Sequence, residues 1–168
     1  MPTAALAHGV SATDATTSPD IVARPTVSGE KAVLRSDGTA AIPKDAPAAV
    51  RKLISAANEI VGKPYKWGGG HGRLDDTGYD CSGAVSYGLV RAGLLSGPLA
   101  SGGFAAALAE GSGRWITVYA NADHAYLEVA GLRLDTSSIG DPGGQAGVHW
   151  RPAIGQRAGF TASHPAGL

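Results

Sequence analysis

The chain has a single cysteine, Cys81, and its setting favours nucleophilic chemistry. A glycine-rich loop from Lys63 to Gly72 precedes it, and a predicted helix that ends near Gly93 follows it. Val85 and Leu89 lie four residues apart and form an apolar helix face. In the first helical turn, unpaired amides and the positive end of the helix dipole favour a thiolate over a thiol. The sequence thus places a candidate nucleophile at a helix start.

A nucleophilic cysteine needs a base within hydrogen-bond reach, and the base needs a third group that orients its ring. Of the five histidines, His124 is the favoured base because it opens a predicted strand after a turn, and His71 in the glycine-rich loop is a second candidate. Across a tight hairpin, Asp135 returns toward His124. It could orient the imidazole if a register shift or a bulge brings it alongside, and Thr136 and Ser137 are alternatives.

The same residues also allow a reading without catalysis. A single cysteine is often a small core residue. A histidine at a strand end is often a surface or core group, and Asp135 with the polar residues after it is consistent with a turn that ends a strand. Tryptophan rings are expected in the core more often than on a binding platform, which here concerns Trp67, Trp115 and Trp150.

The elements around these residues predict an α+β fold with helices packed on an antiparallel sheet. Asp45 is the predicted N-cap of a helix, with Pro47 in its first turn and an apolar stripe that runs to Val61. Strands are predicted over 114–120, 124–130 and 132–136, with a fourth over 148–151. Helices followed by a run of strands are typical of α+β proteins. Residues 1–43 form a low-complexity segment with a possible hairpin over 31–42, and residues 44–168 form the domain.

Composition excludes several classes of protein. With 168 residues, 43% of them apolar, the chain suits one domain plus a tail. Fourteen basic and fourteen acidic residues cancel, so neither nucleic acid nor an anionic membrane is an expected partner. No apolar run approaches the ~18–20 residues of a membrane span. One cysteine excludes an internal disulfide and a zinc site of several thiolates. We expect a monomer with neither metal nor cofactor.

The start of the chain bears on export. The stretch from Ala4 to Ala7 has the small-residue character of a signal-peptide cleavage site. The basic start and the apolar core that export requires are missing. Either the protein is not exported by that route or the start of the chain is absent.

Two motifs carry a resemblance to a known family. The run Pro64-Tyr65-Lys66-Trp67-Gly68-Gly69-Gly70, followed by Gly78-Tyr79-Asp80-Cys81-Ser82-Gly83-Ala84-Val85, resembles the signature of the NlpC/P60 cysteine peptidases. These are papain-like cell-wall hydrolases with the pattern P-Y-x-W-G-G before a D-C-S-G helix start. The resemblance extends over 48–93, weakens over 124–137 and is absent before Pro43.

The resemblance implies a papain-like fold, with Cys81 as nucleophile, His124 as base and Asp135 near the family's third polar position. It implies no cofactor. It also implies a peptidoglycan stem peptide as substrate and a secreted or cell-envelope location. The expected substrate contacts are Tyr65, Trp67, Asp80 and Ser82. Asp80 and Ser82 match positions that contact the free amine of a stem peptide, consistent with a carboxylate pairing with an ammonium group.

The chain also departs from the family pattern. The usual Pro-Gly-Asp-Leu segment is replaced by residues 113–119, and the third polar position, usually His, Asn or Gln, is acidic. These differences indicate a divergent branch. The leading hypothesis is a cysteine hydrolase that cleaves an amide of the cell wall. The alternatives are an amidase or acyltransferase of the same fold with another substrate, and a non-catalytic wall-binding module.

Overall fold

The structure, a computed structural model, describes residues 26–140 and 146–168. The stretch with Ala4 to Ala7, and the rest of the low-complexity segment before residue 26, lies outside them. The elements in chain order are β1 (Thr26–Val27), β2 (Val33–Leu34), β3 (Ala40–Pro43), α1 (Ala48–Ile60), α2 (Cys81–Arg91), a 3-10 turn (Ser101–Gly103), α3 (Phe104–Ala107), β4 (Ala109–Glu110), β5 (Ile116–Ala120), β6 (Ala125–Val129), β7 (Leu132–Asp135), β8 (His149–Pro152) and β9 (Thr161–His164).

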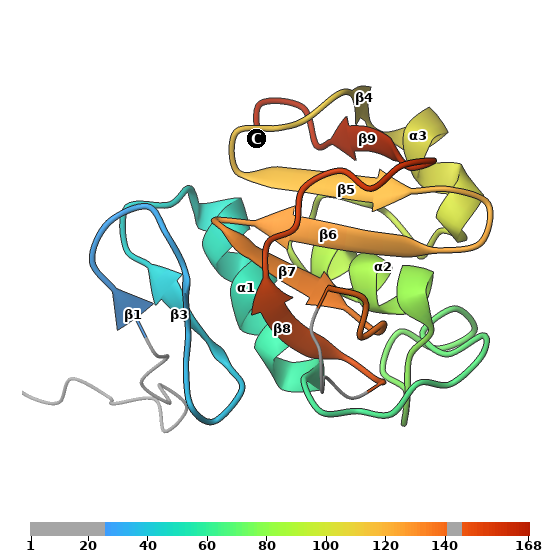
Figure 1. Cartoon of the computed structure of the whole chain (residues 1–168), viewed down its shortest axis with the longest axis horizontal. Coiled ribbons are helices and arrows are strands. Elements are labelled where there is room, and N and C mark those ends of the chain that lie inside the picture. The colour runs from blue at the N-terminus through green and yellow to red at the C-terminus, as the bar shows by residue number, and fades with distance from the viewer. Residues whose placement is uncertain (1–25, 141–145) are drawn as a thin grey trace, which may run out of the picture.

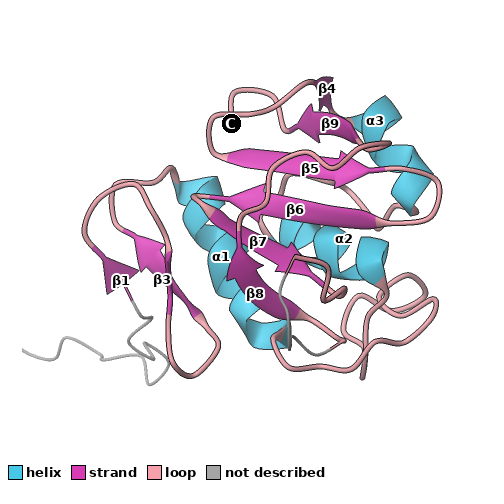
Figure 2. Cartoon of the chain, viewed as in Figure 1, coloured by secondary structure: helices cyan, strands magenta, loops and turns pink. Residues whose placement is uncertain are grey.

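A six-stranded sheet in the order β4-β9-β5-β6-β7-β8 forms the centre of the molecule. Every pair in it is antiparallel. The helices α1 and α2 lie behind this sheet, and α3 lies at the end that carries β4 and β9 (Figure 1). Figure 2 shows the same two layers by secondary structure. The predicted α+β class, with helices packed on an antiparallel sheet, is confirmed.

The hairpin of β6 and β7 follows the predicted order of strands. Its connection is Ala130-Gly131, and both residues have positive φ angles, 48° and 89°. Such two-residue turns match the twist of the strands they join. The register pairs Leu127 with Leu134 and Val129 with Leu132. Each side chain of β7 is therefore placed by the hairpin relative to β6.

The sequence did not predict the two-residue strands β1 and β4, nor the longer strand β9. β9 lies in the glycine- and proline-rich end of the chain and pairs with both β4 and β5, with Val118 opposite Ser163. Its residues Thr161-Ala162-Ser163-His164 include no large apolar side chain, so the alternating pattern of a strand is weak there. Pairing with the edge of β5 decides its conformation.

The helix α1 differs at its start from the prediction. Its N-cap is Pro47, and no side chain caps it, so the assignment of Asp45 as N-cap was wrong. The apolar stripe is buried as expected and comprises Val50, Leu53, Ile54, Ala57 and Ile60. Gly62 follows the helix with a φ of 83° and turns the chain toward the glycine-rich loop.

The helix α2 is buried on all sides along most of its length. Residues 81 to 89 are all buried, including Ser82 and Ser86, so the expected single apolar face was too narrow a description. The helix ends as predicted: the amides of Gly93 and Leu94 donate to the carbonyls of Val90 and Leu89. Gly93, with a φ of 76°, adopts the left-handed conformation of this helix end.

A second, three-stranded sheet in the order β1-β3-β2 precedes α1. β2 and β3 are antiparallel, with Val33 opposite Ala41, around the turn that contains Asp37-Gly38. Ala40 and Ile42 belong to the same buried cluster as the core of α1, so the packing crosses the predicted boundary between residues 43 and 44. No helix in 26–140 or 146–168 is both long enough and apolar enough to cross a membrane.

The two faces of the central sheet are covered differently. Ala125, Leu127 and Val129 of β6 join the main core with the helices. Tyr126, between them, points to the opposite face and packs in a smaller cluster with Tyr119, Phe160 and Ala162. The segment between β8 and β9 crosses this face (Figure 1). The Tyr126 hydroxyl donates to the Gly155 carbonyl of that segment over 2.7 Å. Side chains on this face are thereby shielded from solvent.

Candidate active site

The glycine-rich loop packs directly on the start of α2. The Gly69 carbonyl accepts the Asp80 amide over 3.3 Å. A Cβ at Gly83 would lie 2.0 Å from the Gly69 oxygen, and a Cβ at Gly69 would lie 2.3 Å from the Gly78 oxygen. Glycine at positions 69 and 83 therefore permits this close approach. An isolated parallel β-bridge between the backbones of Tyr65 and Tyr79 fixes another part of the loop.

Cys81 occupies the first position of α2. Asp80 is the N-cap, and its carboxylate accepts the Gly83 amide over 2.7 Å. The cysteine is buried, with 7% of its surface exposed. Its sulfur lies 3.5 Å from the Ser101 hydroxyl and 4.0 Å from the Asp123 carbonyl oxygen. Burial alone fits a core cysteine, but the polar contacts around the sulfur do not.

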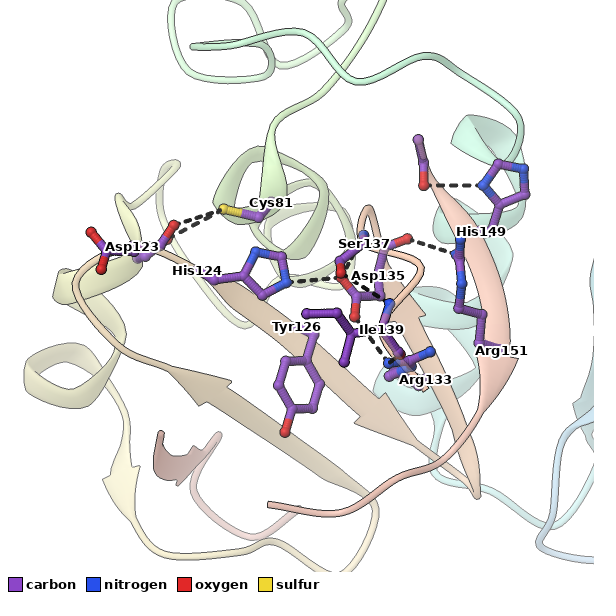
Figure 3. Close-up of polar contacts among 12 residues, drawn as sticks. Cys81, Asp123, His124, Tyr126, Arg133, Asp135, Ser137, Ile139, His149 and Arg151 are labelled. Atoms are coloured by element: carbon purple, nitrogen blue, oxygen red, sulfur yellow. Dashed lines mark hydrogen bonds and ion pairs between the residues drawn. The ribbon is translucent and has the colours of Figure 1, made fainter. Parts of the chain in front are cut away.

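His124 lies one residue before β6, and a turn stabilised by Asn121 fixes its position. The Asn121 side chain accepts the amides of Asp123 and His124 over 2.9 and 2.8 Å. Nε2 of the imidazole lies 2.9 Å from Oδ1 of Asp135. The ring lies between Cys81 and Asp135, with Nδ1 on the side of the cysteine (Figure 3). The three residues form one line from thiol to carboxylate.

Asp135 reaches the imidazole without a register shift or a bulge, so that expected condition was unnecessary. Continued by one step beyond Leu127 and Leu134, the register places Asp135 opposite Tyr126. His124 lies two residues from Tyr126 on the same face, within diagonal reach of Asp135. Of the two alternatives, Ser137 donates its backbone amide to Asp135 over 2.9 Å. Asp135 is therefore the candidate whose side chain contacts the imidazole.

The electrostatics of this line favour an ion pair. Burial opposes ionisation of Cys81, but hydrogen bonds to His124 and Ser101 outweigh it and lower the pKa of the thiol. Burial likewise acts to lower the pKa of His124, but hydrogen bonds to Asp135 and Cys81 raise it to about 9. A lowered thiol pKa beside a raised imidazole pKa favours the thiolate–imidazolium pair over the neutral pair.

A second polar cluster flanks the nucleophile. Oδ1 of Asp80 lies 2.9 Å from Nε2 of His71 and accepts the Ser82 hydroxyl over 3.2 Å. His71 is therefore a neighbour of Asp80, and Nε2 of His124, not His71, contacts Asp135. Oδ2 of Asp80 accepts the Gly68 amide over 3.1 Å. The carboxylate is held in place, with Oδ2 carrying fewer contacts than Oδ1.

The aromatic residues of the loop lie at the surface. Trp67 is 88% exposed, so its expected place in the core was wrong. Trp150 is buried as expected and donates to Asn58 over 2.8 Å, whereas Trp115 is half-buried. Tyr65 is 48% exposed. Burial, followed by the charges of Cys81 and Asp80, raises the pKa of Tyr65.

Two residues of the site were missed from the sequence. Ser101, buried in the connector after α2, contacts the sulfur, and Arg133 contacts Asp135 with Nη1 3.2 Å from Oδ2. Ser101 carries no local signal, because it is one of several small residues in a Gly/Ser/Pro stretch. Arg133 could have been noticed as a charged residue within an apolar strand. Among the described residues, no group of three His, Cys, Asp or Glu side chains is placed to hold a metal ion.

Ser101 offers a direct test of the sulfur's environment. We expect Ser101→Ala to raise the pKa of Cys81 by roughly half to one unit, because a hydrogen bond to the thiolate is lost. The pH dependence of Cys81 alkylation by iodoacetamide measures this shift. The exposed Ser96 lies in the same connector, and Ser96→Ala is the control. An unchanged midpoint in Ser101→Ala would show that the hydroxyl does not stabilise the thiolate.

The comparisons with known proteins concern the fold and the class of protein. No protein-family model matches the chain. The chain is 36% identical over 96 residues to a protein named "Probable endopeptidase" from Mycobacterium tuberculosis, and to one of the same name from Mycobacterium bovis. The match covers 54% of this chain and 24% of each relative, so the chain spans about a quarter of their length.

Among solved structures, the peptidoglycan hydrolase RipB from Mycobacterium tuberculosis matches with a TM-score of 0.51 and 24% sequence identity. The match covers 69% of this chain and 64% of RipB. The chain resembles the NlpC/P60 family and has its fold. In this fold, the helix that starts at Cys81 and the strand that follows His124 bring the two residues of the expected catalytic pair together.

Proposed function

We propose that the chain is a cysteine hydrolase that cleaves an amide bond in the stem peptides of bacterial peptidoglycan. The observation that carries the proposal is the line Cys81, His124 and Asp135, in which a buried carboxylate orients an imidazole beside a thiol at a helix start (Figure 3). The two relatives named endopeptidases and the fold of RipB support the class of substrate. Such a substrate implies that the protein acts in the cell envelope.

In the proposed reaction, the Cys81 thiolate attacks the carbonyl carbon of the amide. The Cys81 backbone N–H, at the positive end of α2, would donate one hydrogen bond to the oxyanion. The His124 imidazolium then gives its proton to the leaving amine, and an acyl-enzyme remains. Neutral His124 next takes a proton from water, whose oxygen attacks the thioester; the acid leaves, and the Cys81 thiolate and the His124 imidazolium are restored. Asp135 holds the ring in one orientation through both steps.

The substrate would lie along the surface that carries Tyr65, Trp67 and Asp80, while Ser82 is buried and its hydroxyl donates to Asp80. Tyr65 and Trp67 are exposed on the glycine-rich loop, which packs on the start of α2 through the hydrogen bond from the Asp80 amide to the Gly69 carbonyl. The carboxylate of Asp80 is the charged group of this surface that suits the free amine of a stem peptide. Its Oδ1 is occupied by Gly83, His71 and Ser82, so Oδ2 is the better placed acceptor.

Asp80→Asn tests recognition of the amine. Asparagine is an equally good N-cap, so α2 should remain intact while the negative charge is lost. We expect kcat/KM to fall about 10–100-fold for a stem tetrapeptide with a free N-terminal amine, mainly through KM, because a charge-assisted hydrogen bond is lost. The N-acetylated tetrapeptide should show a much smaller difference between wild type and variant.

The control for this charge change is Asp37→Asn, since Asp37 lies in the exposed turn of the N-terminal sheet. It should leave both substrates unaffected. An equal loss on the free and the acetylated peptide would contradict the role of Asp80 in amine recognition. It would leave the assignment of Cys81 and His124 intact.

Two measurements separate the alternatives. A thiol-reactive probe should label Cys81 rapidly near neutral pH, and slow labelling would favour a non-catalytic wall-binding module. Mass analysis of products from digested peptidoglycan, beside a screen of small thioesters, distinguishes a stem-peptide hydrolase from an amidase or acyltransferase of the same fold. Turnover of thioesters alone would overturn the proposed substrate.

A further inference from the structure

Asp135 forms an ion pair with a second buried charged residue, Arg133. Arg133 lies two positions earlier on β7, on the same face of the sheet, and neither side chain is exposed. Nη1 of Arg133 lies 3.2 Å from Oδ2 of Asp135 and donates to the Ile139 carbonyl over 2.6 Å. Oδ1 of the same carboxylate contacts His124 and the Ser137 amide. The two oxygens of Asp135 therefore face different partners, as Figure 3 shows.

A buried carboxylate is costly unless a cation compensates it. The Asp135 position is usually neutral in the family that the chain resembles, so the acidic residue here adds a charge to the site. With Cys81 as thiolate and His124 as imidazolium, the two negative and the two positive groups of the line cancel. Without Arg133 the same line would carry a net negative charge away from solvent.

The other charged groups around this pair have partners of their own. Glu128 of β6 and Arg151 of β8 lie opposite Arg133 in the two registers, and His149 lies opposite Asp135. Glu128 accepts the amides of Ile154 and Gly155, each over 2.7 Å. Arg151 donates to the main-chain oxygen of Asp135 over 3.3 Å, and Nδ1 of His149 faces the Gly147 carbonyl. Arg133 is thus in direct contact with the carboxylate that orients His124.

We propose that Arg133 is a positioning residue of the active site, which fixes Asp135 and balances the charge of the Cys81–His124 pair. The inference rests on the proposed function for the roles of Cys81 and His124. Arg133 itself touches neither the sulfur nor a substrate. It acts through Asp135, because a carboxylate held by Arg133 on one oxygen presents the other oxygen to the imidazole.

The direction of the expected pKa shifts follows from the charge that is removed. Removal of a positive charge raises the pKa of every neighbouring acid, so Arg133→Met should move the titration midpoints of Cys81 and His124 to higher pH. Removal of a negative charge does the reverse, so Asp135→Asn should move both to lower pH. We expect shifts of roughly half a pH unit or more. Arg133→Lys keeps the charge and should leave both midpoints close to wild type.

The experiment measures the midpoint of Cys81 from its alkylation rate with iodoacetamide, and that of His124 from its imidazole NMR signal. Because the chain has one cysteine, alkylation reports on Cys81 alone. The matched control is Arg114→Met, which removes an arginine whose side chain is 73% exposed in an ion pair with Glu30. Unchanged midpoints in folded Arg133→Met would overturn the inference.

Arg133→Met leaves the buried Asp135 without its compensating cation, so a second comparison covers the case in which this variant does not fold. The double variant Arg133→Met/Asp135→Asn removes both charges together. Compared with Asp135→Asn alone, it should show a higher Cys81 midpoint, and equal midpoints would again overturn the inference. None of these readouts uses a substrate. Absence of stem-peptide cleavage by the wild-type protein would therefore contradict the proposed function and leave the role of Arg133 to be decided by the midpoints.

Discussion

Cys81→Ala is expected to abolish cleavage of peptidoglycan stem peptides, a loss of at least about 10⁴-fold, while the fold remains intact. The thiolate is the atom that forms the acyl-enzyme, and no other group in the proposed mechanism can replace it. The variant removes only a sulfur from a buried site at the start of α2, so the cost in stability should be small. Product release from muropeptides, followed by mass analysis, gives the activity.

The fold of Cys81→Ala is checked by thermal unfolding beside Ser55→Ala, a half-buried serine in the helix α1. Both variants should unfold near the wild-type temperature, and Ser55→Ala should keep its activity. Full activity in Cys81→Ala would refute the assignment of the nucleophile. It would also remove the basis of the proposed cysteine mechanism.

His124→Ala is expected to lower kcat by roughly 10²–10⁴-fold, because proton transfer to the leaving amine loses its donor. The thiol also loses the hydrogen bond and the charge that lower its pKa, so alkylation of Cys81 should require a higher pH than in the wild type. In the wild type, activity should fall as pH rises through about 9, where His124 loses its proton. Kinetics across pH, with alkylation of the same samples, test both statements.

His149→Ala is the histidine control, since His149 lies on β8 with Nδ1 turned to the Gly147 carbonyl. It should retain most of the wild-type rate. Asp135→Ala should lower turnover much less than His124→Ala, because it affects the orientation of the base and not its presence. If Asp135→Ala kept the full rate while Ser137→Ala lost it, Asp135 would not be the third member of the site.

In the proposed site, the acidic residue at position 135 favours an ion pair of Cys81 and His124. A neutral residue at position 135 could orient the imidazole but would add no charge to hold its proton. Asp135 supplies that charge, and the raised pKa of His124 follows in part from it. The cost of burying the carboxylate is offset by Arg133, two residues away on the same strand. The difference from the family pattern thus changes the charges of the site as a group.

The sequence by itself determined the parts of this protein that depend on neighbouring residues. The Asp80-Cys81 helix start follows from a capping residue before an apolar run, and the hairpin of β6 and β7 follows from alternating residues around Ala130-Gly131. The candidate pair Cys81 and His124 could be chosen because one lies at a helix start and the other at a strand start. Each of these signals lies within a few residues of its element.

Only the tertiary structure decided which residues complete the site. The approach of Ser101 to the sulfur, the pairing of β9 with β5 and the contact of Trp67 with solvent depend on segments that are distant in sequence. Asp135 and Arg133 were visible as residues, but their burial on one face, against His124 and each other, required the register and the covering segment between β8 and β9. Spacing along a chain specifies local geometry, whereas burial and contact across strands arise when the whole sheet is packed.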